Sequence, residues 1–165
     1  MSLFKKPNLF KATVHINYLN TSKQINNAFA FVNINEEDSW INIDSNFIAC
    51  NQNSLIKIYT PKHEYYLFVP SALIYSDQQS NIYINMVSKP VWLVADKRHK
   101  DVITNKAHEQ VKQAMEQLDM IAAKLDYEFN FNNVYEYEKT LNLIYEARLK
   151  GVLCLIEREL EHEKN

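Results

Sequence analysis

A single glycine, Gly151, is present among the 165 residues of the chain. Phosphate-binding loops, dinucleotide-binding loops and the nucleophile elbow of hydrolases all need glycine, because a side chain would block the phosphate or strain the turn. One glycine therefore excludes the protein classes that are built on these motifs. It also means that asparagine, which tolerates a positive φ better than other non-glycine residues, has to serve in the tight turns.

The first hundred residues predict β-strands joined by short turns. Apolar residues alternate with polar ones over residues 11–19, which is the period of a half-buried strand. Three hairpins are expected from similar runs separated by turn residues. They lie at about 28–44, 54–70 and 71–88. No helical crossover separates these strands, so we expect an antiparallel sheet.

The hydrophobic period changes at about residue 101. From Ala107 to Phe129, apolar residues recur at steps of three and four, which predicts a helix of about 102–129. Asn133 precedes Glu136 by three residues and resembles a capping box, so a second helix of about 134–162 is expected. Two long helices with a short connection form an antiparallel hairpin.

The whole pattern predicts an α+β fold. Residues 1–100 are expected to form an antiparallel β-barrel or sandwich of seven to nine short strands. Residues 101–165 are expected to form the two-helix antiparallel hairpin.

Gly151 falls inside the second predicted helix, in a row of small residues with Ala147 and Cys154. Such a row lets another backbone approach closely, and Ala107 of the first helix is a candidate neighbour. The alternative is that Gly151 ends the helix after Lys150 in a left-handed cap. No capping residue follows to begin a new helix, so the sequence favours a continuous helix. A third interpretation is that the row meets a second copy of the chain.

A second apolar edge on this helix suggests a partner. Leu149, Leu153 and Leu160 lie beside the main apolar stripe of the helix rather than on it. One neighbouring helix does not easily cover both the main stripe and this second edge. We therefore expect a non-catalytic interaction or assembly protein that binds a protein partner or a second copy through the hairpin. The candidate interface consists of Ala147, Leu149, Gly151, Leu153, Cys154 and Leu160.

One compact basic patch lies where the strands give way to the helices. It consists of Lys97, Arg98, His99 and Lys100. Basic residues beside exposed tyrosines bind RNA, single-stranded DNA or a nucleotide phosphate, so the alternative function is a small nucleic-acid- or nucleotide-binding module. A solvated linker is the simpler interpretation, and the formal net charge of −2 predicts no general attraction to nucleic acid.

Strands followed by helices make the chain similar to two families, pleckstrin-homology-like barrels, which end in a helix, and PilZ domains. The PilZ resemblance implies a small barrel that binds cyclic di-GMP. That ligand needs paired arginines before the first strand and an Asp/Asn-x-Ser-x-x-Gly motif. Here no arginine precedes Arg98 and no glycine completes the motif. The resemblance thus implies a barrel without the usual ligand site.

No combination of residues predicts catalysis. His108 and Glu109 begin like the helix of a zinc protease, but a lysine stands where the second histidine is needed. The E-x-x-H motif that ends at His162 has no second copy, which di-iron bundles require. Cys50 and Cys154 have no base placed beside them by the sequence. We therefore expect no enzymatic activity, no cofactor and no metal.

The composition favours a cytoplasmic protein. No apolar run approaches the roughly 20 residues that span a bilayer, and the first residues do not resemble a signal peptide. The two cysteines are far apart in the sequence, as expected in a reducing compartment. Abundant asparagine, isoleucine and lysine are typical of an AT-rich genome, so a bacterium or phage is the expected source.

Overall fold

The computed structural model describes residues 10–158 and has an α+β fold, as predicted. The chain divides into two compact units. The first contains the residues up to Asn33 and Trp40–Val91, and the second contains Ile34–Ser39 and the residues from Trp92 onward. The second unit thus begins nearer residue 91 than residue 100, and it includes a short segment from the strand-rich half.

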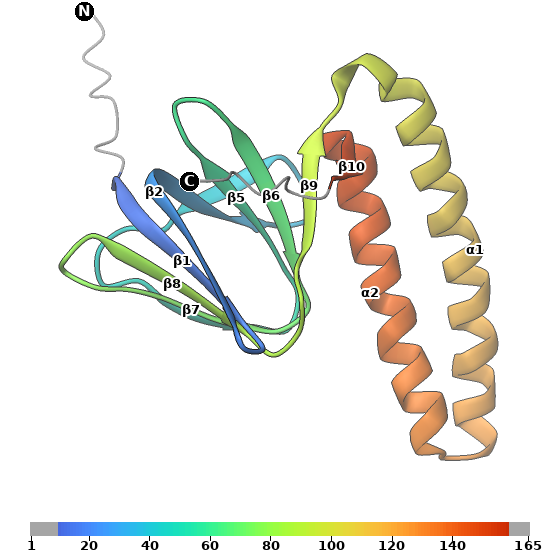
Figure 1. The fold of residues 1–165 in the computed structure, drawn as a ribbon. Coiled ribbons are helices and arrows are strands. Elements are labelled where there is room, and N and C mark those ends of the chain that lie inside the picture. Colours follow the sequence, from blue (N-terminus) through green and yellow to red (C-terminus); the bar gives the residue numbers. More distant parts are fainter. Residues whose placement is uncertain (1–9, 159–165) are drawn as a thin grey trace, which may run out of the picture. The chain divides into compact units, whose positions relative to one another are not determined.

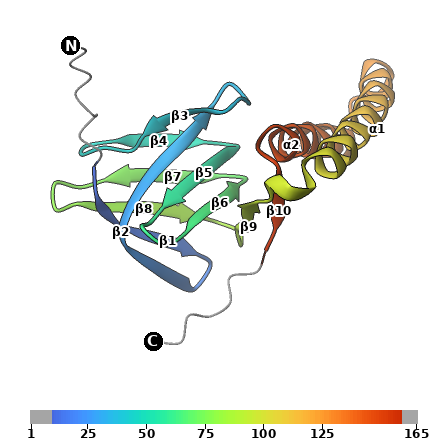
Figure 2. The ribbon, with the colours of Figure 1, turned by 90° about the horizontal axis from the view of Figure 1, so that it is seen from above.

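Strands β1 to β8 build the first unit. They are β1 (Ala12–Tyr18), β2 (Thr21–Ile34), β3 (Ser39–Asn42), β4 (Ile48–Asn51), β5 (Ser54–Tyr59), β6 (Glu64–Val69), β7 (Ala72–Ser76) and β8 (Asn81–Met86). Neighbouring strands follow the order β6-β5-β2-β1-β8-β7-β4, and β3 pairs with β2. The sheet curls into a half-barrel (Figure 1, Figure 2).

The three predicted hairpins are present as β2–β3, β5–β6 and β7–β8. The β5–β6 turn closes with a hydrogen bond from the Thr60 amide to the His63 carbonyl at 2.8 Å. In the β7–β8 turn, the Asp77 amide donates to the Asn81 carbonyl at 3.0 Å. Local alternation and turn residues were thus sufficient to place these pairs.

The expectation of a wholly antiparallel sheet is wrong for one pair, because β1 and β8 run parallel. Val14 lies opposite Ile82, and Ile16 lies opposite Ile84. The connection between these strands is the intervening set of strands rather than one helix. Counting helical crossovers in the sequence therefore did not reveal the parallel pair.

The alternating residues of the strands form the core of the first unit. Val14 and Ile16 of β1, Ile82 and Ile84 of β8, and Ile74 of β7 have no exposed surface. Full burial of such a side chain contributes roughly 1.5–3 kcal/mol. This face of the sheet is therefore the main source of stability in the first unit.

Strand β2 belongs to both halves of the curled sheet. Its first half pairs with β1 and its second half pairs with β5. The register shifts between Ala12 and Val14 of β1, and Asn27 of β2 has a φ of 55° there. A bulge of this kind bends a strand and increases its twist, so β2 can turn from one half to the other.

Asparagine occupies some of the turn positions with a positive φ, as expected in a chain with a single glycine. Within residues 10–158, seven non-glycine residues have a positive φ. They are Leu19, Asn27, Asn35, Glu36, Asn46, Ser80 and Cys154. The prediction holds at the three asparagines, and four other residue types accept the same conformation.

The second unit contains the helices and a two-stranded ribbon. Its elements are β9 (Val91–Ala95), the 3₁₀-helix η1 (Lys97–His99), α1 (Lys100–Tyr127), α2 (Phe131–Leu153) and β10 (Leu155–Glu157). Strand β10 pairs antiparallel with β9, with Ile156 opposite Val94. The two helices lie side by side as an antiparallel hairpin (Figure 1).

Helix α2 begins and ends differently from the predicted helix of 134–162. Its cap is Asn130 rather than Asn133, and the Asn130 side chain accepts a hydrogen bond from the Asn132 amide at 2.8 Å. The helix ends at Leu153, where Cys154 takes a left-handed conformation. Leu155 then pairs with β9 and is 2 % exposed, so strand pairing outweighs the local helical pattern.

Gly151 lies inside α2 and makes the close approach that the small residues predicted. A Cβ atom at Gly151 would lie 3.0 Å from the Cβ of Ala107 on α1. The left-handed cap occurs three residues later, at Cys154, and not at Gly151. Gly151 is therefore a packing residue between two helices.

We predict that Gly151→Leu destabilises the chain strongly, whereas Gly151→Ala is nearly neutral. Leucine forces the helices apart, which typically costs about 1–3 kcal/mol. Alanine gains about 1 kcal/mol of helix propensity, and crowding against Ala107 offsets that gain. Thermal unfolding of both variants measures the difference.

Ala107→Gly provides the matched background for this comparison. With the Ala107 methyl removed, Gly151→Ala should become clearly stabilising, because the contact at 3.0 Å is gone. Equal effects of Gly151→Ala in both backgrounds would show that the two positions are not coupled.

Candidate interaction surfaces

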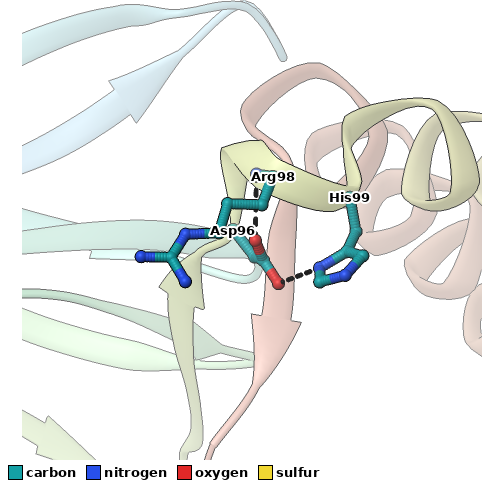
Figure 3. Close-up of polar contacts among 3 residues, drawn as sticks. All are labelled: Asp96, Arg98 and His99. Carbon is teal, nitrogen blue, oxygen red and sulfur yellow. Dashed lines mark hydrogen bonds and ion pairs between the residues drawn. The ribbon is translucent and has the colours of Figure 1, made fainter.

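The predicted basic patch lies at the base of the hairpin, defined here as residues 96–106 with 146–158. Lys97, Arg98 and His99 form η1, and Lys100 begins α1; all four are exposed. Asp96 organises this turn (Figure 3). One of its carboxylate oxygens accepts from the Arg98 amide at 3.0 Å, and the other lies 2.8 Å from Nδ1 of His99.

The Asp96 contacts reduce what the patch can offer to an anion. The hydrogen bond with His99, followed by the Arg98 amide, holds the pKa of Asp96 below its ordinary value. His99 thus faces a carboxylate, whereas the guanidinium of Arg98 points away from it (Figure 3). Lys97, Arg98 and Lys100 are left as the exposed cations of the patch.

The predicted partner edge on α2 is largely covered. Ala147, Leu149 and Cys154 are buried, and Leu149 has no exposed surface at all. Gly151 and Leu153 are half-buried, and Leu160 lies outside the described residues. The premise that Leu149 belongs to an uncovered edge is therefore wrong, since Leu149 is already packed within the chain.

The opposite end of the hairpin exposes aromatic side chains that the sequence analysis did not single out. We define the tip as residues 126–138. Tyr127 is 94 % exposed, Phe129 73 % and Phe131 81 %. The rings of Phe129 and Phe131 meet edge to face with centroids 5.5 Å apart. The prediction that Phe129 belongs to the apolar stripe of the first helix is wrong, because α1 ends at Tyr127 and the Phe129 side chain is exposed.

Hydrogen bonds on both sides hold the connection that carries Phe129. The Glu128 amide donates to the Lys124 carbonyl at 2.9 Å. On the other side, the Val134 amide donates to the Asn130 carbonyl at 3.1 Å, in addition to the Asn130 side-chain cap. A large aromatic surface on a fixed backbone loses little conformational entropy on binding, which is typical of interface anchors.

A row of rings crosses the first unit on strands β1, β8 and β7. His15 stacks on Tyr83, and Tyr83 stacks on Tyr75, each with centroids 4.8 Å apart. Asn81 links His15 at 3.2 Å to the Asp77 carboxylate at 2.9 Å. Burial, and then the Asp77 charge, raise the pKa of Tyr83. Tyr83 thus has a ring neighbour on each side, so the middle of the row is not an open platform for stacking bases.

The described residues contain no cluster of three or more histidine, cysteine or acidic side chains suited to a metal ion. Cys50 is exposed and Cys154 is buried, and both are free thiols. Within residues 10–158, no helix is both long and apolar enough to cross a membrane.

An ion cluster joins the end of α2 to β10. The Lys150 ammonium lies 2.8 Å from Glu157 and 3.9 Å from Glu146. Burial raises the pKa of Glu146, Lys150 lowers it by a smaller amount, and Glu157 raises it further. Lys150 thus compensates only part of the cost of ionising Glu146.

We predict that the stability of the Glu146→Gln variant, relative to that of the wild type, increases as pH rises above 4.5. The folded state binds the Glu146 proton more tightly than the unfolded state, whose pKa is near 4.5. The wild type therefore loses stability as pH rises through the folded-state pKa, and glutamine removes that loss. Melting temperatures from pH 4 to pH 8 measure the trend.

Glu116→Gln, at an exposed position on α1, controls for the loss of one negative charge. The opposite trend would be a melting temperature of the wild type that rises relative to that of Glu146→Gln as pH rises. It would show that the Lys150 charge dominates this cluster.

Comparison with known families gives a match over the strand-rich part of the chain. Residues 13–91 match the family described as the UU051 N-terminal domain. The match begins in β1 and ends at Val91, so it spans β2 to β8 and stops before η1 and α1. A search of curated proteins found no match. The chain is thus similar to the UU051 N-terminal domain over its strands, and the hairpin lies beyond that similarity.

Proposed function

We propose that the chain is a non-catalytic interaction or assembly protein that binds a protein partner, or a second copy of itself, through the C-terminal helical hairpin. The observation that carries this proposal is the exposed aromatic tip, centred on Tyr127, Phe129 and Phe131. Exposed aromatic groups that lie together on a fixed backbone are typical anchors of protein interfaces. The two free cysteines support a cytoplasmic setting for this role.

The small buried surface of the hairpin supports the same proposal. Among its 28 residues, α1 buries only Ala107, Ala114 and Ile121, which recur every seventh residue as one narrow seam. Met115 and Met120 of the same helix are 48 % and 61 % exposed. Exposed apolar side chains beside a narrow seam provide further area for contact with a partner.

We predict that the wild-type chain shows hairpin-dependent association. Light scattering at micromolar concentration should give a mass above 19.5 kDa, or a tagged chain should retain a specific partner on purification from its native cell. Phe129→Ser combined with Phe131→Ser should abolish that association, because the substitution removes both anchors without altering the helix caps.

Tyr59→Ser serves as the control, since Tyr59 is a 44 % exposed aromatic residue of the first unit. Association that survives the tip substitution but is lost on Tyr59→Ser would move the interface to the strands. A chain that stays monomeric and retains no partner in any form contradicts the proposed function.

The alternative function, a nucleic-acid- or nucleotide-binding module, is supported by the exposed Lys97, Arg98 and Lys100. Asp96 and Asp101 lie beside them, and so few phosphate contacts give weak binding with a shallow salt dependence. We predict no submicromolar binding to RNA or DNA at physiological salt. Tight binding that is lost in a Lys97→Ala/Arg98→Ala variant would favour the module over the assembly protein.

A further inference from the structure

The tip of the hairpin is acidic throughout. Between residues 126 and 138 there are four acidic side chains and no lysine or arginine. Asp126, Glu128 and Glu138 are exposed, and Glu136 is half-buried. The aromatic anchors Phe129 and Phe131 thus lie on a segment with a net negative charge, in which Glu136 is paired with Lys139 at 3.9 Å.

The base of the hairpin has the opposite charge. Residues 96–106 contain four basic side chains and two acidic ones. On the α2 side, Arg148 pairs with Glu36 at 3.1 Å and Lys150 pairs with Glu157 at 2.8 Å, so the uncompensated positive charge of the base lies on residues 96–106. Lys97, Arg98, Lys100 and Lys106 are all exposed. Between base and tip, residues 107–125 and 139–145 contain three acidic and three basic side chains. Along α1 and its preceding turn, the hairpin therefore changes from positive at the base to negative at the tip.

Apolar surface accompanies the charge at both ends. At the base, Val102 is 68 % exposed, Val152 55 % and Ile156 37 %. At the tip, the exposed groups are the aromatic side chains described above. Each end thus offers apolar contact area surrounded by charge, which is the composition of a protein interface with a polar rim.

We propose that a second copy of the chain binds both the tip and the base. The two hairpins lie antiparallel, with the tip of each against the base of the other. The distance from base to tip is the same in both copies, so one twofold axis brings both pairs of ends together at once. Twofold symmetry is the commonest arrangement of homodimers. This inference rests on the proposed function and specifies the partner and its orientation.

The same charges oppose other occupants of the tip. Two tips in contact would bring eight acidic side chains together, and like charges in an interface suppress association. An anionic membrane surface would repel the tip for the same reason. The positive base of another copy is the complementary surface that the chain itself provides.

Charge reversal at each end tests the arrangement on the full-length chain. The base variant is Lys97→Glu/Arg98→Glu, and the tip variant is Asp126→Lys/Glu128→Lys. Sedimentation equilibrium should show that each variant alone dimerises about tenfold or more weakly than the wild type. The base variant makes both contacts repulsive, and the tip variant leaves the tip neutral, so both of its contacts lose their attraction. An equimolar mixture of the two variants should recover dimers. In the mixed dimer the unchanged acidic tip of one chain meets the unchanged basic end of the other, and the lysines introduced at the second tip meet the glutamates introduced at the second base.

Lys62→Glu/Lys89→Glu is the matched control. It changes the net charge by the same amount as the base variant, at exposed positions of the first unit. This control should dimerise as the wild type does. Circular dichroism and melting temperature should show that all variants remain folded, and wild-type association should weaken as salt rises.

The outcomes separate this inference from the proposed function. A dimer that is insensitive to both charge reversals, but is lost on Phe129→Ser/Phe131→Ser, overturns the antiparallel arrangement and leaves the proposed function intact. A wild-type chain that is monomeric but retains a protein partner through the tip likewise overturns the antiparallel arrangement and leaves the proposed function intact. If each charge-reversal variant fails to dimerise alone, and the mixture forms a species of twice 19.5 kDa, the antiparallel arrangement is established.

Discussion

The bend in β2 is the constraint on which the first unit depends. One strand pairs with β1 through its first half and with β5 through its second, so both halves of the sheet share a continuous backbone. Asn27 accepts a positive φ at the bulge where this change takes place. Without the bend, the isoleucines of β5 and of β8 would lie on one flat face and would not enclose a core.

The second unit depends on a different kind of contact. Its helices approach closely where Gly151 meets Ala107, and the ribbon of β9 and β10 fixes the end of α2. Narrow packing of this kind leaves most of the helical surface free for other contacts. The first unit therefore derives its stability from a buried core, whereas the second combines a thin core with extensive exposed apolar surface.

Features set by neighbouring residues were predictable from the sequence, and features set by distant contacts were not. Strand alternation and turn residues gave three hairpins, and the change of period gave the helices. The run from Val152 to Ile156 fits a helix as well as a strand, so only its pairing with β9 decides the end of α2. Leu149 appeared to lie on an open edge because its burial depends on contacts that helical periodicity does not encode. The residues of the basic patch are neighbours in the sequence, but the bond between Asp96 and His99 depends on the three-dimensional turn.

The parallel pairing of β1 with β8 bears on how the chain is made. Asn17 and Asn85 are joined by a side-chain hydrogen bond although they are 68 residues apart in sequence. On the ribosome, β1 emerges early, pairs with β2 and then presents an open edge until β8 is available. Unpaired edges recruit wrong partners, and contacts of high sequence separation form slowly. The nascent first unit therefore has a vulnerable interval that ends only when residue 86 has left the exit tunnel.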